Sequence, residues 1–260
     1  MISMKGFASA LFMLGAAILM PGAAAAGSLD AIRGHGTIAL CAHPNALPFS
    51  SRKGELPGFQ LELGQAIAKQ LGVALEPVWI IGPSQIRRSG CDMLLDAIAD
   101  PEAQGETGLQ ISKPYYRTGV VLAVRGDSPI ASPNAIDPHA KIGVMGSSVA
   151  AVTLNQRGLT ISSYGFEDDM LDALAAKEID AAAVSRASAG YFNVTHPKEP
   201  IRAIDIGAMA PGLSWNVAVG LVKPDDKLRQ AIDAALNRLM EDGTIQRIYA
   251  RYGIALQPPK

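Results

Sequence analysis

The sequence predicts an α/β protein built from two lobes with a cleft between them, and three observations predict this class. Short apolar runs alternate with segments of helical periodicity, which is typical of parallel sheets covered by helices. A similar alternation restarts in the second half of the chain. Two long extended stretches separate the halves, and they predict two strands that join the lobes. We expect lobe one over residues 27–120, lobe two over 121–217, and a return to lobe one over 218–260.

The first lobe begins with a buried strand over Thr37–Ala42, "TIALCA". A helix is expected over Phe59–Leu71, because apolar side chains recur there at helical spacing. The runs "VALEPVWII" and "CDMLLDAI" complete the lobe as two further strands. This β-α-β order predicts a parallel sheet.

The second lobe follows the same scheme. "AKIGVMG" is a predicted strand, and Ser147 or Ser148 can cap the helix that runs towards Arg157. "LTISSYG" is a strand, residues 166–177 form a helix, and "IDAAAV" is another strand. The joining stretches are "YYRTGVVLAVRGDSP" and "LSWNVAVGLVKPDD", and two closing helices are expected over about 228–239 and 244–252.

Composition and the N-terminus indicate an exported protein. The 260 residues are 48% hydrophobic and 18% charged, with a formal net charge of −1, which gives no basic surface for nucleic acid or anionic membranes. Lys5, an uncharged apolar run and a cluster of alanines predict a cleaved signal peptide over residues 1–26. An uncleaved membrane anchor is the alternative, but the run is short for a span. We expect a monomer without stable membrane insertion.

Two cysteines, Cys41 and Cys91, stand at the ends of predicted strands. In an oxidising compartment two thiols more often pair than stay free, and two buried free thiols are the alternative. No metal site is expected, because the four histidines are scattered without ligand spacing.

Six stretches together resemble the type II periplasmic solute-binding proteins, which include receptors for polar amino acids. These are "LPFS", "GFQLELGQAIAKQLG", "SKPYYRTGVVLAVR", "KIGVMGSS", "LDALAAKEIDAAAV" and "VAVGLVKPDDKLRQAIDAALNRLMEDGTIQRIYARYG". They cover about Thr37 to Gly253 in the family's order. The resemblance implies a periplasmic protein whose two lobes close on a ligand for an ABC permease.

A narrower likeness lies in "CAHPNALPFS", "CDMLLDAI" and "KPYYRTGVV". These are similar to the quinoprotein-dehydrogenase-associated branch, the J-type accessory proteins of bacterial methanol oxidation. That likeness implies a quinoprotein alcohol dehydrogenase or a cytochrome c as partner, and a disulfide that joins the first strand to the third. The sequence departs from the branch pattern at His43 (for Asp), Ala46 (for Asn) and Asp96 (for Gly).

The two charges that grip an α-amino acid in receptors of this family are missing. At the family's arginine position the sequence "DPEAQ" has Ala103, and at its aspartate position "IDAAAVSRA" has Ser185 beside Arg186. Because a zwitterion buried without partners costs several kcal/mol, the sequence disfavours a free α-amino acid as ligand.

Other polar and aromatic residues are candidates for the cleft. Phe49 either covers a ligand or packs against Tyr115 in the core at the rim of the cleft. Ser147 and Ser148 either hold an anion at the N-terminus of a helix or simply cap that helix. Asp96 touches the ligand or binds backbone amides. Tyr115 and Tyr116 are expected to face the core and the cleft rim, one each. The full candidate set is Asn45, Phe49, Ser50, Asp96, Tyr116, Gly146, Ser147, Ser148, Ser185 and Arg186.

Three functions remain open on the sequence. The first is a periplasmic accessory of a quinoprotein alcohol dehydrogenase, and the second is an importer receptor for a small organic solute without an ammonium group. The third is a dehydratase-like enzyme with Asp96 as its acid or base. No Gly-x-Ser-x-Gly, phosphate-binding loop or paired-histidine motif is present, so no catalytic residue and no cofactor are expected.

Overall fold

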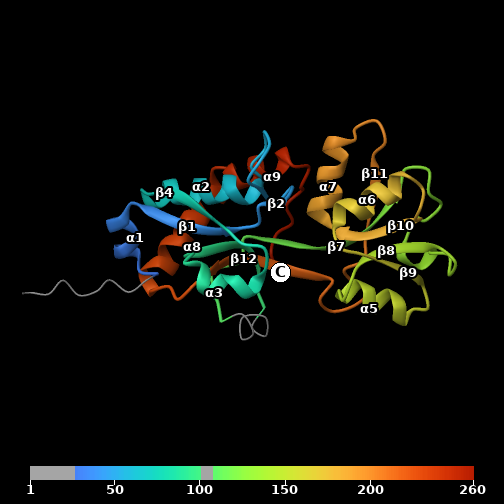
Figure 1. Ribbon diagram of the computed structural model, residues 1–260, viewed down its shortest axis with the longest axis horizontal. Coiled ribbons are helices and arrows are strands. Elements are labelled where there is room, and N and C mark those ends of the chain that lie inside the picture. Colours follow the sequence, from blue (N-terminus) through green and yellow to red (C-terminus); the bar gives the residue numbers. More distant parts are fainter. Residues whose placement is uncertain (1–26, 101–107) are drawn as a thin grey trace, which may run out of the picture.

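The computed structural model describes residues 27–100 and 108–260. The expected signal peptide over 1–26 and Ala103 lie outside the described residues. Figure 1 shows two lobes, with α1, α2, α8 and α9 in the first and α5, α6 and α7 in the second, and β7 and β12 running between them. Within the described ranges, no helix is long and apolar enough to cross a membrane.

The helices and strands have the following bounds. The helices are α1 (Leu29–His35), α2 (Phe59–Leu71), α3 (Ile86–Ser89), α5 (Val149–Gln156), α6 (Glu167–Ala175), α7 (Arg186–Thr195), α8 (Asp226–Glu241) and α9 (Thr244–Arg251). The strands are β1 (Thr37–Ala42), β2 (Asn45–Ala46), β3 (Ser50–Ser51), β4 (Ala74–Trp79), β5 (Met93–Ile98), β6 (Gln110–Ile111), β7 (Tyr116–Arg125), β8 (Lys141–Met145), β9 (Thr160–Tyr164), β10 (Ala181–Ser185), β11 (Ile201–Asp205) and β12 (Ser214–Leu221).

Both lobes hold mixed sheets, not the purely parallel ones that the sequence predicted. In lobe one β4, β1 and β5 are parallel, and β12 joins β5 antiparallel. In lobe two β9, β8 and β10 are parallel, and β7 joins β10 antiparallel, with β11 on its other side. The mixed pairing arises because the strands that enter each lobe from the other one run against the parallel set.

The two crossing strands each take part in both lobes. The first residues of β7 pair with the first residues of β12, from Tyr116 opposite Val217 to Gly119 opposite Ser214. Beyond this pairing β7 continues into the sheet of lobe two and β12 into that of lobe one. The lobes are therefore joined by an antiparallel pair of strands.

Lobe two is buried on both faces of its sheet. Successive residues of β7 point to opposite faces, so Leu122 and Val124 pack with α5 while Val121 and Ala123 pack with α6 and α7. This explains why "VVLAV" is apolar throughout instead of alternating.

The helix α7 also touches lobe one. Its Ala187 and Tyr191 pack against the hydrophobic core of the first lobe. Its Gly190 lies so close to the segment after α9 that an added Cβ would stand 2.3 Å from the carbonyl oxygen of Gly253. The chain end completes this contact zone, because Arg117 donates its backbone N–H to the carbonyl of Gln257 at 2.8 Å.

The two cysteines form the expected disulfide. Cys41 at the end of β1 is bonded to Cys91 just before β5, and both are buried. The bond joins neighbouring parallel strands of lobe one, as the resemblance implied.

Candidate functional site

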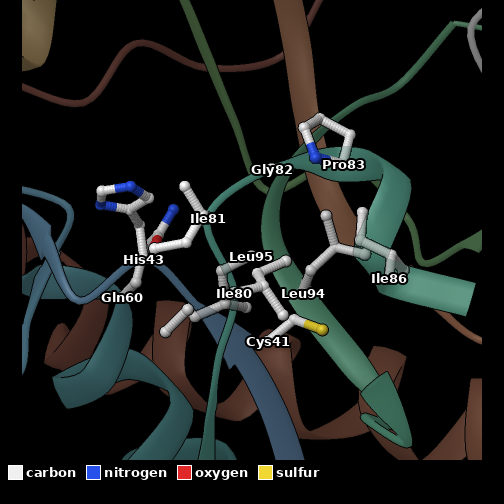
Figure 2. A pocket seen from close by; sticks show the side chains of 11 residues that line it. Cys41, His43, Gln60, Ile80, Ile81, Gly82, Pro83, Ile86, Leu94 and Leu95 are labelled. Atoms are coloured by element: carbon white, nitrogen blue, oxygen red, sulfur yellow. The ribbon is translucent and has the colours of Figure 1, made fainter. Parts of the chain in front are cut away.

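A pocket opens in lobe one where β1 and β4 end. Its volume is about 260 Å³, and among the residues that the structure describes no charged side chain lines it. The ends of parallel strands are the usual place for ligands in α/β sheets. Most of the lining is aliphatic, and its large side chains come from three segments: Ile80, Ile81, Ile86, Leu94 and Leu95. Figure 2 shows these side chains around the opening, with the sulfur of Cys41 below them.

Two polar side chains, those of His43 and Gln60, stand together at one end of this pocket (Figure 2). His43 follows β1, and Gln60 lies in the first turn of α2. The Nδ1 atom of His43 accepts the backbone N–H of Asn45 at 3.1 Å. A neutral imidazole that accepts at Nδ1 carries its proton on Nε2, so His43 offers a donor at the other nitrogen.

Asp96 lies behind Gln60 at a bulge in β5. In the pairing of β5 with β12, Ala97 lies opposite Ala218 and Leu94 lies opposite Gly220. Between these two pairs β5 has two residues and β12 has one, which makes the bulge. At this point the φ of Asp96 is +57°, a left-handed conformation that favours glycine. The bulge re-aims the side chain of Asp96 towards α2 and away from the usual alternation of the strand.

Four side chains surround the Asp96 carboxylate in the described part of the chain. Gln60 donates its amide N–H to Oδ2 at 2.8 Å. The hydroxyl of Tyr116 donates to Oδ1 at 2.8 Å, and those of Tyr115 and Tyr249 lie 3.4 Å from the same oxygen. Burial raises the pKa of Asp96, although these hydrogen bonds act to lower it. Burial also raises the pKa of each of the three tyrosines.

The first loop holds three of the sequence candidates in different environments. Asn45 is exposed. Phe49 is half-buried and packs on Phe59, with ring centroids 5.2 Å apart, and not on Tyr115. Ser50 is buried, and its hydroxyl donates to the carbonyl of His43 and accepts from the same residue's N–H.

The tyrosine pair corrects one expectation. Tyr115 and Tyr116 are 4% and 3% exposed, so the prediction that one of them faces the cleft rim was wrong. Both rings are held inward because their hydroxyls reach Asp96.

In lobe two the serine candidates act at helix starts. Ser148 caps α5 by accepting the N–H of Ala151 at 3.1 Å, while Ser147, beside exposed Gly146, is itself exposed with φ +59°. Ser185 caps α7 by accepting the N–H of Ser188.

A carboxylate and a guanidinium lie close to Ser185, and the sequence reasoning missed the carboxylate. Glu167, in the first turn of α6, accepts the N–H and the hydroxyl of Ser185, both at 2.7 Å. Arg186 donates to Asp205 at 2.6 Å. Burial acts to raise the pKa of Asp205, but the Gly207 amide, Arg186 and Arg117 outweigh it and lower that pKa.

None of the ten sequence candidates lines the pocket of lobe one. Asp96 and Tyr116 meet in one hydrogen-bonded cluster, and Ser185 and Arg186 adjoin at the start of α7. Asn45, Phe49 and Ser50 share the first loop, and Gly146, Ser147 and Ser148 lie together before α5. His43 and Gln60, the polar side chains that line the pocket, were not candidates. A clue was available only for His43, since it replaces the aspartate expected in the first loop.

Comparisons with known proteins agree with this architecture. The model of the bacterial extracellular solute-binding proteins, family 3, matches residues 38–255. The histidine-binding periplasmic protein of Salmonella typhimurium is 24% identical over 80% of this chain and 84% of its own. The lysine/arginine/ornithine-binding periplasmic protein of Escherichia coli is 25% identical over 79% of this chain and 83% of its own.

A solved structure shows the same fold. The substrate-binding protein of an amino acid ABC transporter from Streptococcus pneumoniae, bound to L-arginine, superposes with a TM-score of 0.68 at 21% identity, covering 88% of this chain and 98% of its own. These relatives lend no support to the quinoprotein-associated branch. The two-lobed fold and the extent of the family match lead to one conclusion: this chain belongs to the bacterial extracellular solute-binding proteins, family 3.

Proposed function

We propose that this chain is an exported receptor for a small, mainly aliphatic organic solute without net charge, which it presents to an ABC permease. The observation that carries the proposal is the lining of the lobe-one pocket. Over residues 27–100 and 108–260 this lining is mostly aliphatic, His43 and Gln60 are polar, and no charged side chain takes part. An apolar pocket with a few convergent polar groups is the usual form of a small-molecule site. Closure of the second lobe would then complete the enclosure.

The relatives that bind amino acids set the competing expectation. A free α-amino acid brings an ammonium and a carboxylate, and each needs a partner when it leaves water. The pocket lining offers neither charge. The carboxylate of Asp96, which contacts the pocket-lining Gln60, already accepts hydrogen bonds from Gln60 and Tyr116. These contacts support an uncharged solute over a zwitterion.

A thermal-shift screen tests this function. Uncharged aliphatic alcohols, ketones and amides are expected to raise the melting temperature of the purified protein, and histidine, lysine and arginine are not. The variant Ile81→Asp puts a charge at a 69% exposed pocket position and should abolish the shift. Val152→Asp, at a 54% exposed position on α5, is the matched control and should keep it. Stabilisation by an amino acid, with none by uncharged solutes, would overturn the proposal.

A second candidate is the accessory role beside a quinoprotein alcohol dehydrogenase. The observation in its favour is the Cys41–Cys91 bond, which the likeness to that branch implied. Pull-down from a periplasmic extract separates the two roles. Recovery of a dehydrogenase or a cytochrome c supports the accessory role, while recovery of a permease supports the receptor.

A further inference from the structure

We infer that Asp96 is a positioning residue that fixes the amide of Gln60 so that the pocket selects a hydroxyl group, and that the solute is therefore an aliphatic alcohol. This inference rests on the proposed function, since it concerns the same pocket.

The first step is the orientation of the Gln60 amide. The NH₂ group of Gln60 faces Oδ2 of Asp96 and donates a hydrogen bond to it at 2.8 Å. The other oxygen, Oδ1, is occupied by tyrosine hydroxyls. The hydroxyl oxygens of Tyr115 and Tyr249 also lie 3.2 Å apart, and the hydrogen bond between them holds the cluster together. The carboxylate therefore cannot turn away from Gln60.

The second step is what Gln60 leaves for a ligand. One N–H of its amide is donated to Asp96, and within the described residues its carbonyl oxygen has no protein donor. Gln60 is one of the residues that line the pocket. It therefore presents a hydrogen-bond acceptor there.

The third step is the neighbouring donor. The backbone N–H of Asn45 occupies Nδ1 of His43, which leaves Nε2–H as the free polar atom of that ring. Figure 2 places the two side chains at the same end of the pocket, opposite the aliphatic lining.

A donor and an acceptor side by side match a hydroxyl group. An alcohol donates its O–H to Oε1 of Gln60 and accepts from Nε2–H of His43 with the same oxygen. A ketone accepts from His43 but leaves the carbonyl of Gln60 unpaired in a desolvated site. A buried acceptor without a partner costs about 1–3 kcal/mol, which corresponds to an affinity lower by about 5- to 150-fold.

Cyclohexanol and cyclohexanone test this inference, because they share a ring size and differ at one functional group. By calorimetric titration the wild-type protein should bind the alcohol about tenfold more tightly than the ketone. In Asp96→Asn the asparagine can offer its own NH₂ towards Gln60, which turns the amide over and points a donor into the pocket. The preference should then invert in favour of the ketone.

Two further variants keep the test decisive. Gln60→Met removes the acceptor, together with the hydrogen bond that Gln60 donates to Asp96, and should bring the two ligands to parity, whether or not Asp96→Asn folds. Asp92→Asn is the matched control: this half-buried carboxylate, just before the same strand, accepts from the N–H of Ala39 and does not line the pocket. It should keep the wild-type preference.

The outcomes separate this inference from the proposed function. Equal affinity of the wild type for both compounds, or a ratio that Gln60→Met leaves unchanged, overturns the hydroxyl selection alone. So does binding of other uncharged solutes while neither ring compound binds. If no uncharged solute binds at all, the proposed function is overturned as well.

Discussion

Removing the disulfide of lobe one should lower the stability of the whole protein by an amount that can be worked out from the structure. Cys41 and Cys91 are 50 residues apart in the chain. On the chain-entropy model, a cross-link over this separation removes about 14 cal/mol/K from the unfolded state, or about 4 kcal/mol at 25 °C. Both residues are buried, so the double variant Cys41→Ala/Cys91→Ala avoids placing new polar groups in the core.

Urea unfolding followed by far-ultraviolet circular dichroism measures this loss. With a denaturant dependence of about 2.5 kcal/mol/M, a loss of 4 kcal/mol lowers the midpoint by about 1.5 M. Reduced wild-type protein should unfold near the same midpoint as the double variant. Ser89→Ala is the matched control, because its hydroxyl lies 3.1 Å from both sulfurs but takes no part in the bond. A midpoint within about 0.3 M of the oxidised wild type would refute the reasoning, since the loop would then already be restrained without the bond.

Three further predictions concern the backbone and the buried carboxylate. Gly190→Ala should lower the free energy of unfolding, measured in urea, by about 1–3 kcal/mol, because the added Cβ would stand 2.3 Å from the carbonyl oxygen of Gly253. Gly165→Ala, with open space around it, is the control and should be near neutral. Burial raises the pKa of Asp96 in the folded state, so the stability that this group contributes is present below its unfolded pKa and is lost as the pH rises through its folded pKa. Lowering the pH from about 7 towards about 4 should therefore raise the urea midpoint of the wild type relative to that of Asp96→Asn. Ser148→Ala should cost about 1 kcal/mol in thermal unfolding because it removes the cap of α5, and Ser147→Ala, at a side chain without a capping bond, should cost less than about 0.5 kcal/mol.

The elements that the sequence predicted best are those whose periodicity is local and strong. The strand over Thr37–Ala42 and the helix over Phe59–Leu71 have the predicted bounds. Both carry regular apolar spacing and face the core of lobe one. The helix α7 was missed; "RASAGYFNVT" has a glycine at its centre, which disfavours a helix locally. That glycine is present for a tertiary reason, the close approach to Gly253, which no local pattern reveals.

The candidate site was harder to predict than the fold. The polar end of the pocket depends on His43, Gln60 and Asp96, which come from a loop, a helix and a strand. They meet only because the chain bulges at Asp96 and redirects its carboxylate. A bulge of this kind depends on the pairing between two distant strands, so the sequence of either strand alone does not indicate it.

The same bulge explains why an aspartate stands where the resemblance leads one to expect glycine. Glycine would adopt the left-handed backbone of residue 96 freely, whereas a residue with a Cβ is disfavoured there by about 1 kcal/mol. Glycine would also leave the Tyr116 hydroxyl and the Gln60 amide without their acceptor inside the protein. Losing one such partner in a buried site costs about 1–3 kcal/mol, which exceeds the backbone strain. The carboxylate therefore stabilises its own conformation through its side chain. Because one of its partners lines the pocket, the residue that stabilises the bulge also determines which polar atom a solute meets.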